Sequence, residues 1–379
     1  MKSIVQHASP NIIAGVNFNT DRFSELFAWM TTLAADSVQA LLQPYQYGLV
    51  LPFDGKRALN LNKTGNKLTL SRCSAITQGG AIIGIFEGIT PILETTISAQ
   101  LQVAHSYYVV IEVDAFHRKT FGPNTSDAPE RPQYSMPTYQ LNIRPVEEDL
   151  GRYSNVLRIG VLAFENGEWA LQNYIPPCLH IGASEILMQQ YEQYQAALKQ
   201  LLDYLPKVIQ QTETFDNLSN KQLREFCTQI GSFLAQGASN YYNLSEYGNP
   251  YQLFQLWSGF AGLGDFLLER LNIQSKRSFY QLLAQNDGIG VNFQPDQLEQ
   301  RLNELAQLSF KQYHIHLAVQ KTNTVLNQIM PLFRRLSIHI KNAGKSWGGD
   351  NGIQNPSNNT ENSPKPENKN RGYIGIGGF

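Results

Sequence analysis

The segment YIPPCLHIGAS, residues 174–184, separates two stretches of this sequence that differ in hydrophobic periodicity. Pro176 and Pro177 remove two adjacent backbone donors and hold the preceding residue extended, so a sheet that reaches this point ends here. Before the segment apolar residues recur at every second position, and after it they recur at every third or fourth. Residues 174–184 therefore predict a junction between a β region and a helical region.

The β region predicts an antiparallel sandwich or barrel. Half-buried alternation is clearest at 138–144, and turn-forming pairs such as Asp54-Gly55 and Asn166-Gly167 separate the runs. Short strands are expected at 59–61, 68–70, 81–86, 107–113, 138–144 and 156–164. Because no helical pattern intervenes between them, an antiparallel architecture is favoured over a doubly wound sheet. The Gly-, Pro-, Asn- and Asp-rich stretch 121–133 predicts an exposed loop between two strands.

One helix is expected before the strands. Residues 20–42 place apolar side chains at near-helical spacing, which predicts an amphipathic helix with a stripe that faces the core. The stripe consists of Phe23, Leu26, Phe27, Met30, Leu33, Val38, Leu41 and Leu42.

The region after the two prolines predicts a helical bundle. A long helix begins at Ser184, and a second begins at Ser219 with Gln222 completing a capping box. A third begins at Asn249-Pro250 as cap and first-turn proline, and a fourth begins at Pro295. The apolar pattern then resumes from Leu317. Long helices joined by short connections indicate a bundle.

The last residues differ from the rest. Beyond Ala343 the composition changes to Gly, Asn, Pro, Ser and Lys, which predicts a disordered tail. The final eight residues regain apolar character and could form a docking motif at the end of a tether, or an idle terminus. The candidate docking residues are Tyr373, Ile374, Ile376 and Phe379.

Composition excludes several classes of function. The 379 residues include 30 basic and 31 acidic side chains, a net charge of −1, so no field of one sign would attract nucleic acid or an anionic membrane. Three distant cysteines fit a reducing compartment, and no secretion signal or membrane-spanning stretch is visible, so a cytoplasmic protein is predicted. Charged residues make up only 16%. This indicates either a surface that packs against neighbours or an organism with Asn-rich proteins.

The chemistry-bearing residues form no convincing site. The string Gly344-Lys-Ser346 lacks the earlier glycine of a phosphate-binding loop, because position 339 is His339. Gly259, Gly262 and Gly264 lie within a helical pattern, which favours close helix packing over a dinucleotide fingerprint. No catalytic residue, metal ligand or cofactor is predicted, and we expect a structural protein that is not an enzyme.

Two motifs resemble a known family. Residues 174–184, and Asn249-Pro-Tyr-Gln-Leu-Phe254 followed by Phe260-Ala-Gly262, resemble the sheet-to-helix junction and third-helix patterns of the type VI secretion baseplate subunit TssK, the ImpJ or VasE family. The residues carried over at the domain junction are Ile175, Pro176, Pro177, Ala183 and Ser184. Those carried over for helix packing are Pro250, Leu253, Phe254, Ala261 and Gly262.

The resemblance implies an α+β protein with a phage-like shoulder at 1–177, a helical neck at 178–341 and a flexible tail at 342–379. It also implies a homotrimer that binds baseplate wedge subunits near the inner face of the cytoplasmic membrane. The family's C-terminal head has no counterpart here, so contact with membrane-complex subunits would fall to the tail. Two alternatives stay open: a carbohydrate-binding or carbohydrate-processing sandwich using Tyr107, Tyr108 and Glu112, and a free adaptor acting only through its tail.

Overall fold

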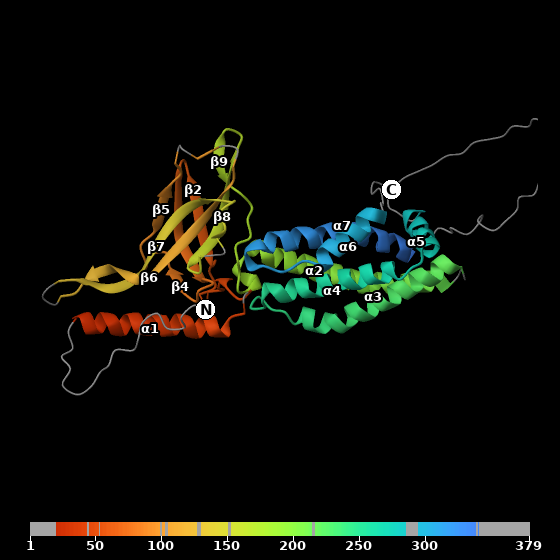
Figure 1. The fold of residues 1–379 in the computed structure, drawn as a ribbon, viewed down its shortest axis with the longest axis horizontal. Coiled ribbons are helices and arrows are strands. Elements are labelled where there is room, and N and C mark those ends of the chain that lie inside the picture. The colour runs from red at the N-terminus through yellow and green to blue at the C-terminus, as the bar shows by residue number, and fades with distance from the viewer. Residues whose placement is uncertain are drawn as a thin grey trace, which may run out of the picture. The chain divides into compact units, whose positions relative to one another are not determined.

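The computed structural model describes residues 20–43, 45–52, 54–98, 101–102, 105–126, 130–150, 153–213, 217–285, 295–338 and 340. A helix and then antiparallel sheets occupy the N-terminal half of these residues, and helices occupy the C-terminal half (Figure 1). The predicted α+β class is therefore confirmed. The predicted tail, with Tyr373 to Phe379, lies outside the described residues.

The first sheet is built around one long strand, β3 (Lys67–Ile76). Strand β3 pairs antiparallel with β1 (Gly48–Leu49), β2 (Leu59–Thr64), β4 (Ile82–Ile85) and β5 (Leu93–Thr96). It pairs with two partners on each side because each partner covers only part of its length. The fully buried Leu68 and Leu70 mark its inward face.

The second sheet has the order β7-β6-β8-β9 and is antiparallel throughout. Its strands are β6 (Tyr107–Asn124), β7 (Pro132–Pro145), β8 (Val156–Glu165) and β9 (Glu168–Leu171). The β8–β9 turn uses Asn166 and Gly167, both at positive φ (53° and 90°), as a two-residue type I′ hairpin requires. The turn expected at Asn166-Gly167 is thus present.

Alternation along β6 places its side chains in two apolar clusters. Val109 and Ile111 point into the main core between the sheets, whereas Tyr108 and Val110 pack with Leu150 on the opposite face. Because the period of a strand is two residues, one strand supplies both faces. The main core continues without a break into the helices. The described residues form one compact unit, and the predicted boundary at residue 177 remains a prediction.

The loop expected at 121–133 is shorter than predicted. Strand β6 continues to Asn124, and Phe121 pairs with Tyr134 in β7. Pro132 is tolerated because it is the first residue of its strand, where a missing donor costs little. The composition-based prediction was wrong for 121–124 and 132–133, where cross-strand pairing outweighs the turn-forming residues.

Helix α1 (Thr20–Leu41) forms as predicted, but its apolar stripe does not face the core. Phe27 is 60% exposed, Met30 51% and Leu41 82%. Instead Thr32, 3% exposed, lies on the side that meets the sandwich. The predicted core-facing stripe is therefore wrong: within this chain α1 packs through its small and polar face.

The C-terminal half is a bundle. Helix α2 packs against α3 and α7, α4 packs against α3 and α6, α6 packs against α7, and α5 packs against α3 (Figure 1). The bounds are α2 Glu185–Glu213, α3 Leu218–Tyr242, α4 Pro250–Glu269, α5 Ile273–Gln285, α6 Pro295–Ala306 and α7 Ile315–Ile338, with 3-10 turns η2 at Ile181–Ala183 and η3 at Gln312–His314. Helix α5 had not been predicted, because its buried apolar residues all lie in its second half.

The helix starts test the capping predictions. Helix α4 has the expected cap, because Asn249 accepts from the Tyr251 backbone N–H (2.9 Å), and Gln252, which accepts from the Asn249 N–H (3.2 Å), adds a capping box that was not predicted. Helix α3 is instead capped by Asn217, which accepts from the Asn220 N–H at 2.8 Å. The predicted cap at Ser219 was wrong, because Asn two residues earlier is an equally good cap and extends the helix.

Candidate functional site

The predicted junction residues lie where the sandwich meets the bundle. The Leu49 N–H donates to the Pro177 carbonyl at 2.7 Å, and the Leu179 N–H donates to the Leu49 carbonyl at 2.8 Å. These two bonds form an isolated parallel bridge between Leu49 and Cys178. Ile175 and Cys178 are buried at 5% and 0% exposure. The double proline thus ends the sheet and also supplies the carbonyl that holds β1.

Gly48 makes this close approach possible. Its φ is +117°, and a Cβ added there would overlap the carbonyl group of Pro177. Only glycine avoids both the conformational strain and the overlap. The backbones of β1 and residues 177–178 therefore meet without any side chain between them.

The other end of the same segment is bonded to the α3–α4 connection. The Ile181 N–H donates to the Gly248 carbonyl and the Gly182 N–H to the Glu246 carbonyl, both at 2.8 Å. The Asn249 side-chain amide donates to the Leu179 carbonyl at 3.3 Å. The two motifs that carried the family resemblance, 174–184 and 249–262, are therefore bonded to each other.

Gln312 links three segments at this point. Its side chain is 1% exposed, and its amide donates to the Tyr47 carbonyl at 2.9 Å and to the Cys178 carbonyl. One buried amide thus satisfies a carbonyl from the start of the sandwich and one from the junction. Because a buried carbonyl without a partner costs about 1–3 kcal/mol, this side chain fixes the junction's position on the bundle.

Arg158 joins the same region through aromatic rings. Its guanidinium, on a residue only 8% exposed, lies 4.6 Å from the ring centroids of both Tyr108 and Tyr313. Such cation–π stacking stabilises a desolvated guanidinium. Burial, and to a lesser degree Arg158, lowers the pKa of His316 nearby. Burial and Arg158 therefore favour the neutral form of His316, and the stacking of Arg158 on Tyr313 fixes the contact between β8 and η3.

The remaining predicted residues lie at the start of α2 and inside the bundle. Ser184 accepts from the Leu187 N–H at 3.4 Å and caps α2, and Ala183 beside it is 6% exposed. Phe254 stacks on Phe310 with ring centroids 5.8 Å apart. Pro250, Leu253, Phe254 and Ala261 are buried, and Gly262 faces Ala306 across the α4–α6 contact. Ala183 and Ser184 belong to the junction, whereas Leu253, Phe254, Ala261 and Gly262 pack helices within the bundle.

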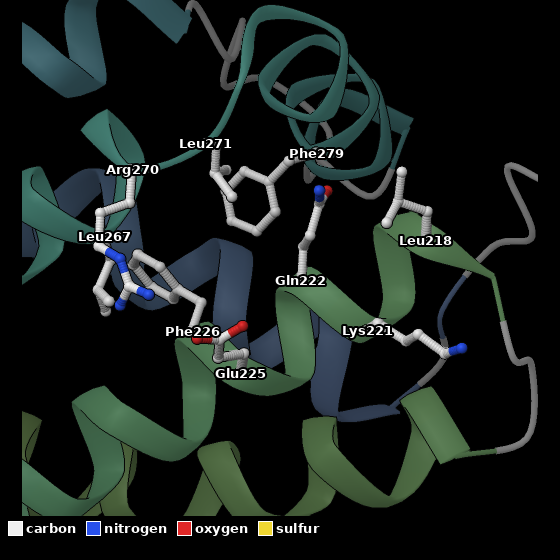
Figure 2. Close-up of a pocket in the computed structure, with 9 residues that line it drawn as sticks. All are labelled: Leu218, Lys221, Gln222, Glu225, Phe226, Leu267, Arg270, Leu271 and Phe279. Carbon is white, nitrogen blue, oxygen red and sulfur yellow. The ribbon is translucent and has the colours of Figure 1, made fainter.

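A pocket of about 290 Å³ lies at the other end of α3, between α3, α4 and α5. Figure 2 shows Gln222 pointing toward Phe279, while the Lys221 side chain points away from them. Its apolar lining comes from Leu218, Phe226, Leu267, Leu271 and Phe279. The pocket holds no cysteine or histidine, so it offers neither a thiol nor an imidazole for chemistry.

The three cysteines are inaccessible in the described residues. The three cysteines are fully buried, and burial raises the pKa of the Cys73 thiol to about 12 and those of Cys178 and Cys227 further. No cluster of three or more His, Cys, Asp or Glu residues with metal-binding geometry occurs in the described part of the chain. No helix there is long and apolar enough to cross a membrane.

The residues proposed for carbohydrate binding have other roles. Tyr107 and Tyr108 are 7% and 6% exposed, so their rings are not available to stack on a sugar. The Glu112 carboxylate accepts two hydrogen bonds from Arg144, at 3.1 and 2.8 Å. These three side chains make contacts within the second sheet. They are therefore not available to bind a carbohydrate as the sequence had suggested.

Sequence reasoning missed Gly48, Arg158 and Gln312. Gln312 bonds carbonyls 134 and 265 positions earlier in the chain, so no local pattern identifies it. Gly48 stands beside Tyr47 and Leu49 in an apolar run, where an isolated glycine does signal a close backbone approach. That single signal was available in the sequence.

No family model and no curated protein matches the sequence. Among solved structures, a crystal structure of TssK covers 84% of this chain and 69% of its own, at 14% identity and a TM-score of 0.51. A chain of the type VI secretion TssK-TssF-TssG baseplate subcomplex is 15% identical, and the match covers 86% of this chain and 99% of that chain with a TM-score of 0.48. TssK from the EAEC type VI system, bound to nanobody nb18, is 15% identical, and the match covers 82% of this chain and 67% of that chain with a TM-score of 0.41.

These findings define a class of protein: an α+β chain in which a buried junction joins an antiparallel sandwich to a helical bundle. The particular fold is that of TssK, which the crystal structure shares over most of this chain. The resemblance indicated by residues 174–184 and 249–262 is therefore confirmed for the fold.

Proposed function

We propose that this chain is a structural subunit of the baseplate of a type VI secretion system, where it connects baseplate wedge subunits to the rest of the machine. The observation that carries the proposal is the fold shared with TssK over 84% of the chain. The sandwich, junction and bundle follow one another in the order that the family resemblance implies.

Two features of the described residues support a structural role. The groups that could perform chemistry, the three thiols and Glu112, are buried or bonded within the chain. Large apolar side chains are exposed instead, including Phe27, Met30 and Leu41 on α1. Exposed apolar surface of this kind is typical of proteins that function in assemblies.

The partners follow from the same proposal. The chain would form a homotrimer and bind wedge subunits of the kind represented by TssF and TssG in the solved TssK-TssF-TssG subcomplex. Contact with membrane-complex subunits is assigned to the tail, residues 344–379. Deleting that tail separates this role from the others: wedge binding persists and recovery of membrane-complex subunits is lost.

A genetic experiment tests the proposal. Deleting the gene in its native cell should abolish assembly of the contractile sheath, observed as fluorescent sheath foci, and wild-type protein supplied in trans should restore it. Affinity purification of the tagged full-length chain should recover wedge subunits. Normal sheath foci in the deletion strain would refute the proposed role.

A further inference from the structure

The exposed face of α1 is the largest departure from what the sequence predicts. Phe27, Met30, Leu33 and Leu41 are 60%, 51%, 45% and 82% exposed. At 3.6 residues per turn, Phe27, Met30 and Leu41 lie on the side of the helix opposite the buried Thr32, and Leu33 lies at the edge of that side, about 100° from Thr32. We refer to residues 27, 30, 33, 34, 37 and 41 as the α1 stripe.

The opposite face of α1 explains why the stripe is exposed. Thr31, Thr32, Ala35, Asp36 and Gln39 line a cavity of about 230 Å³ between the helix and the sandwich. A Cβ added at Gly80 would overlap the Ala35 carbonyl, so the backbones approach closely there. Small and polar residues thus make the contact within the chain, and α1 is held with its apolar side outward.

The spacing of the stripe fits another helix. Positions 27, 30, 34, 37 and 41 alternate steps of three and four residues, the repeat of helices that pack side by side, and Leu33 widens the stripe. The one polar member, Ser37, donates to the Leu33 carbonyl at 2.6 Å within its own helix. Its hydroxyl is therefore satisfied when the stripe is covered.

Charge favours an identical helix as the occupant. Between residues 26 and 43 the only charged side chain is Asp36, which lies toward the sandwich. Arg22 and Glu25, at the start of the helix, form an ion pair with each other at 2.9 Å. Like charges therefore do not oppose the approach of a second copy, and the charged flanks that would select a different partner are missing from this stretch.

The exposed apolar area of the α1 stripe shows how much of an interface it can provide. Taking roughly 150–200 Å² for a fully exposed large apolar side chain, the four exposed fractions correspond to about 400 Å². A stable interface uses about 800 Å² per partner, so the stripe supplies about half and needs a second contact between copies. The homotrimer of the proposed function would provide such a second contact between copies.

We propose that the α1 stripe packs against the α1 helices of other copies of this chain, forming a self-association contact outside the helical bundle. This inference rests on the proposed function, because it deepens the self-assembly assigned there.

Cysteine cross-linking of the full-length chain tests the contact. The native cysteines are fully buried, so mild oxidation reports only on introduced thiols. Met30→Cys, at the middle of α1, should form a covalent dimer at least ~10-fold faster than Gln39→Cys on the opposite face, because neighbouring thiols in an interface have an effective concentration in the millimolar range. Leu41 lies at the end of α1, so two copies of Leu41→Cys meet only if the helices are parallel. The presence or absence of this cross-link therefore gives the relative direction of the two helices.

A charge variant gives a second readout. Phe27→Glu should abolish the Met30→Cys cross-link and lower the mass seen by light scattering, whereas Gln39→Glu should change neither. Circular dichroism of both variants should match wild type, since neither position is in the core.

The possible results are distinct. Equal and slow cross-linking of Met30→Cys and Gln39→Cys overturns the inference, whether the wild-type protein is a monomer or an oligomer. A Met30→Cys cross-link that forms as fast in the presence of Phe27→Glu as without it also overturns the inference, because the contact would then not depend on the stripe. The sheath-assembly experiment is independent, because a failed proposed function leaves the α1 cross-link unaffected.

Discussion

Replacing Gly48 with alanine should separate the sandwich from the junction, and Gly55→Ala is its matched control. Both glycines have positive φ, +117° at Gly48 and +67° at Gly55. A Cβ at Gly55 meets no heavy atom within 4 Å, whereas a Cβ at Gly48 overlaps the Pro177 carbonyl. Both variants place a Cβ at positive φ, with Gly55 in the left-handed region and Gly48 outside it, where alanine is more strained, and only Gly48→Ala also overlaps the junction.

The magnitude follows from the bonds at stake. Alanine at positive φ costs about 1–2 kcal/mol, which is the whole effect expected for Gly55→Ala. At Gly48 the displaced backbone also loses the Leu49–Pro177 and Leu179–Leu49 hydrogen bonds. At about 1 kcal/mol each, these bring the expected loss to about 3–4 kcal/mol. Such a loss is a large part of the roughly 5–15 kcal/mol that stabilises a typical domain.

Urea denaturation, followed by tryptophan fluorescence and circular dichroism, measures the difference. With a denaturant slope of roughly 2 kcal/mol/M, the midpoint of Gly48→Ala should lie about 1 M below that of Gly55→Ala. Equal midpoints for the two variants would refute the argument, because they would show that β1 and residues 177–179 do not depend on their close approach.

Three further predictions concern the junction and the bundle. Gln312→Leu should lower the free energy of unfolding by about 2–4 kcal/mol, measured by urea denaturation, because two buried carbonyls lose their donor; a loss below ~1 kcal/mol would contradict its bridging role. Leu201→Asp should yield no folded protein, because Leu201 is fully buried inside its own chain, whereas Leu256→Asp, at a partly exposed position, should keep the wild-type circular dichroism spectrum; equal effects would show that their burial does not differ in solution. Burial lowers the pKa of His180 below its ordinary value of about 6.5, and its Nδ1 accepts from the Leu51 N–H at 3.1 Å. The unfolded state therefore binds the proton at a higher pH than the folded state does. The stabilisation is fully present above about pH 6.5 and is lost as the pH falls. His180→Gln should reduce that fall between pH 7.5 and 5.5 in parallel thermal unfolding curves, and an unchanged pH profile would refute it.

Local patterns in the sequence determined the elements and their order. Alternation at 138–144 and helical spacing after Ser184 are properties of short stretches, and they specify strand or helix before any tertiary contact forms. The double proline acts locally as well, since it ends a sheet whatever surrounds it. The caps were predictable in part: Asn249 caps α4 as expected, while Asn217 caps α3 in place of Ser219, two residues later, because both residue types are suitable caps.

Only the tertiary structure decided which surfaces are buried. An amphipathic pattern shows that α1 has an apolar side, but which side meets the sandwich depends on the shape of the turn at Gly80, far along the chain. The same holds for the junction, where Gln312 and Arg158 act through partners distant in sequence. The physical reason is that secondary structure follows from interactions within a few residues, whereas burial and buried hydrogen bonds depend on which distant segments share one core.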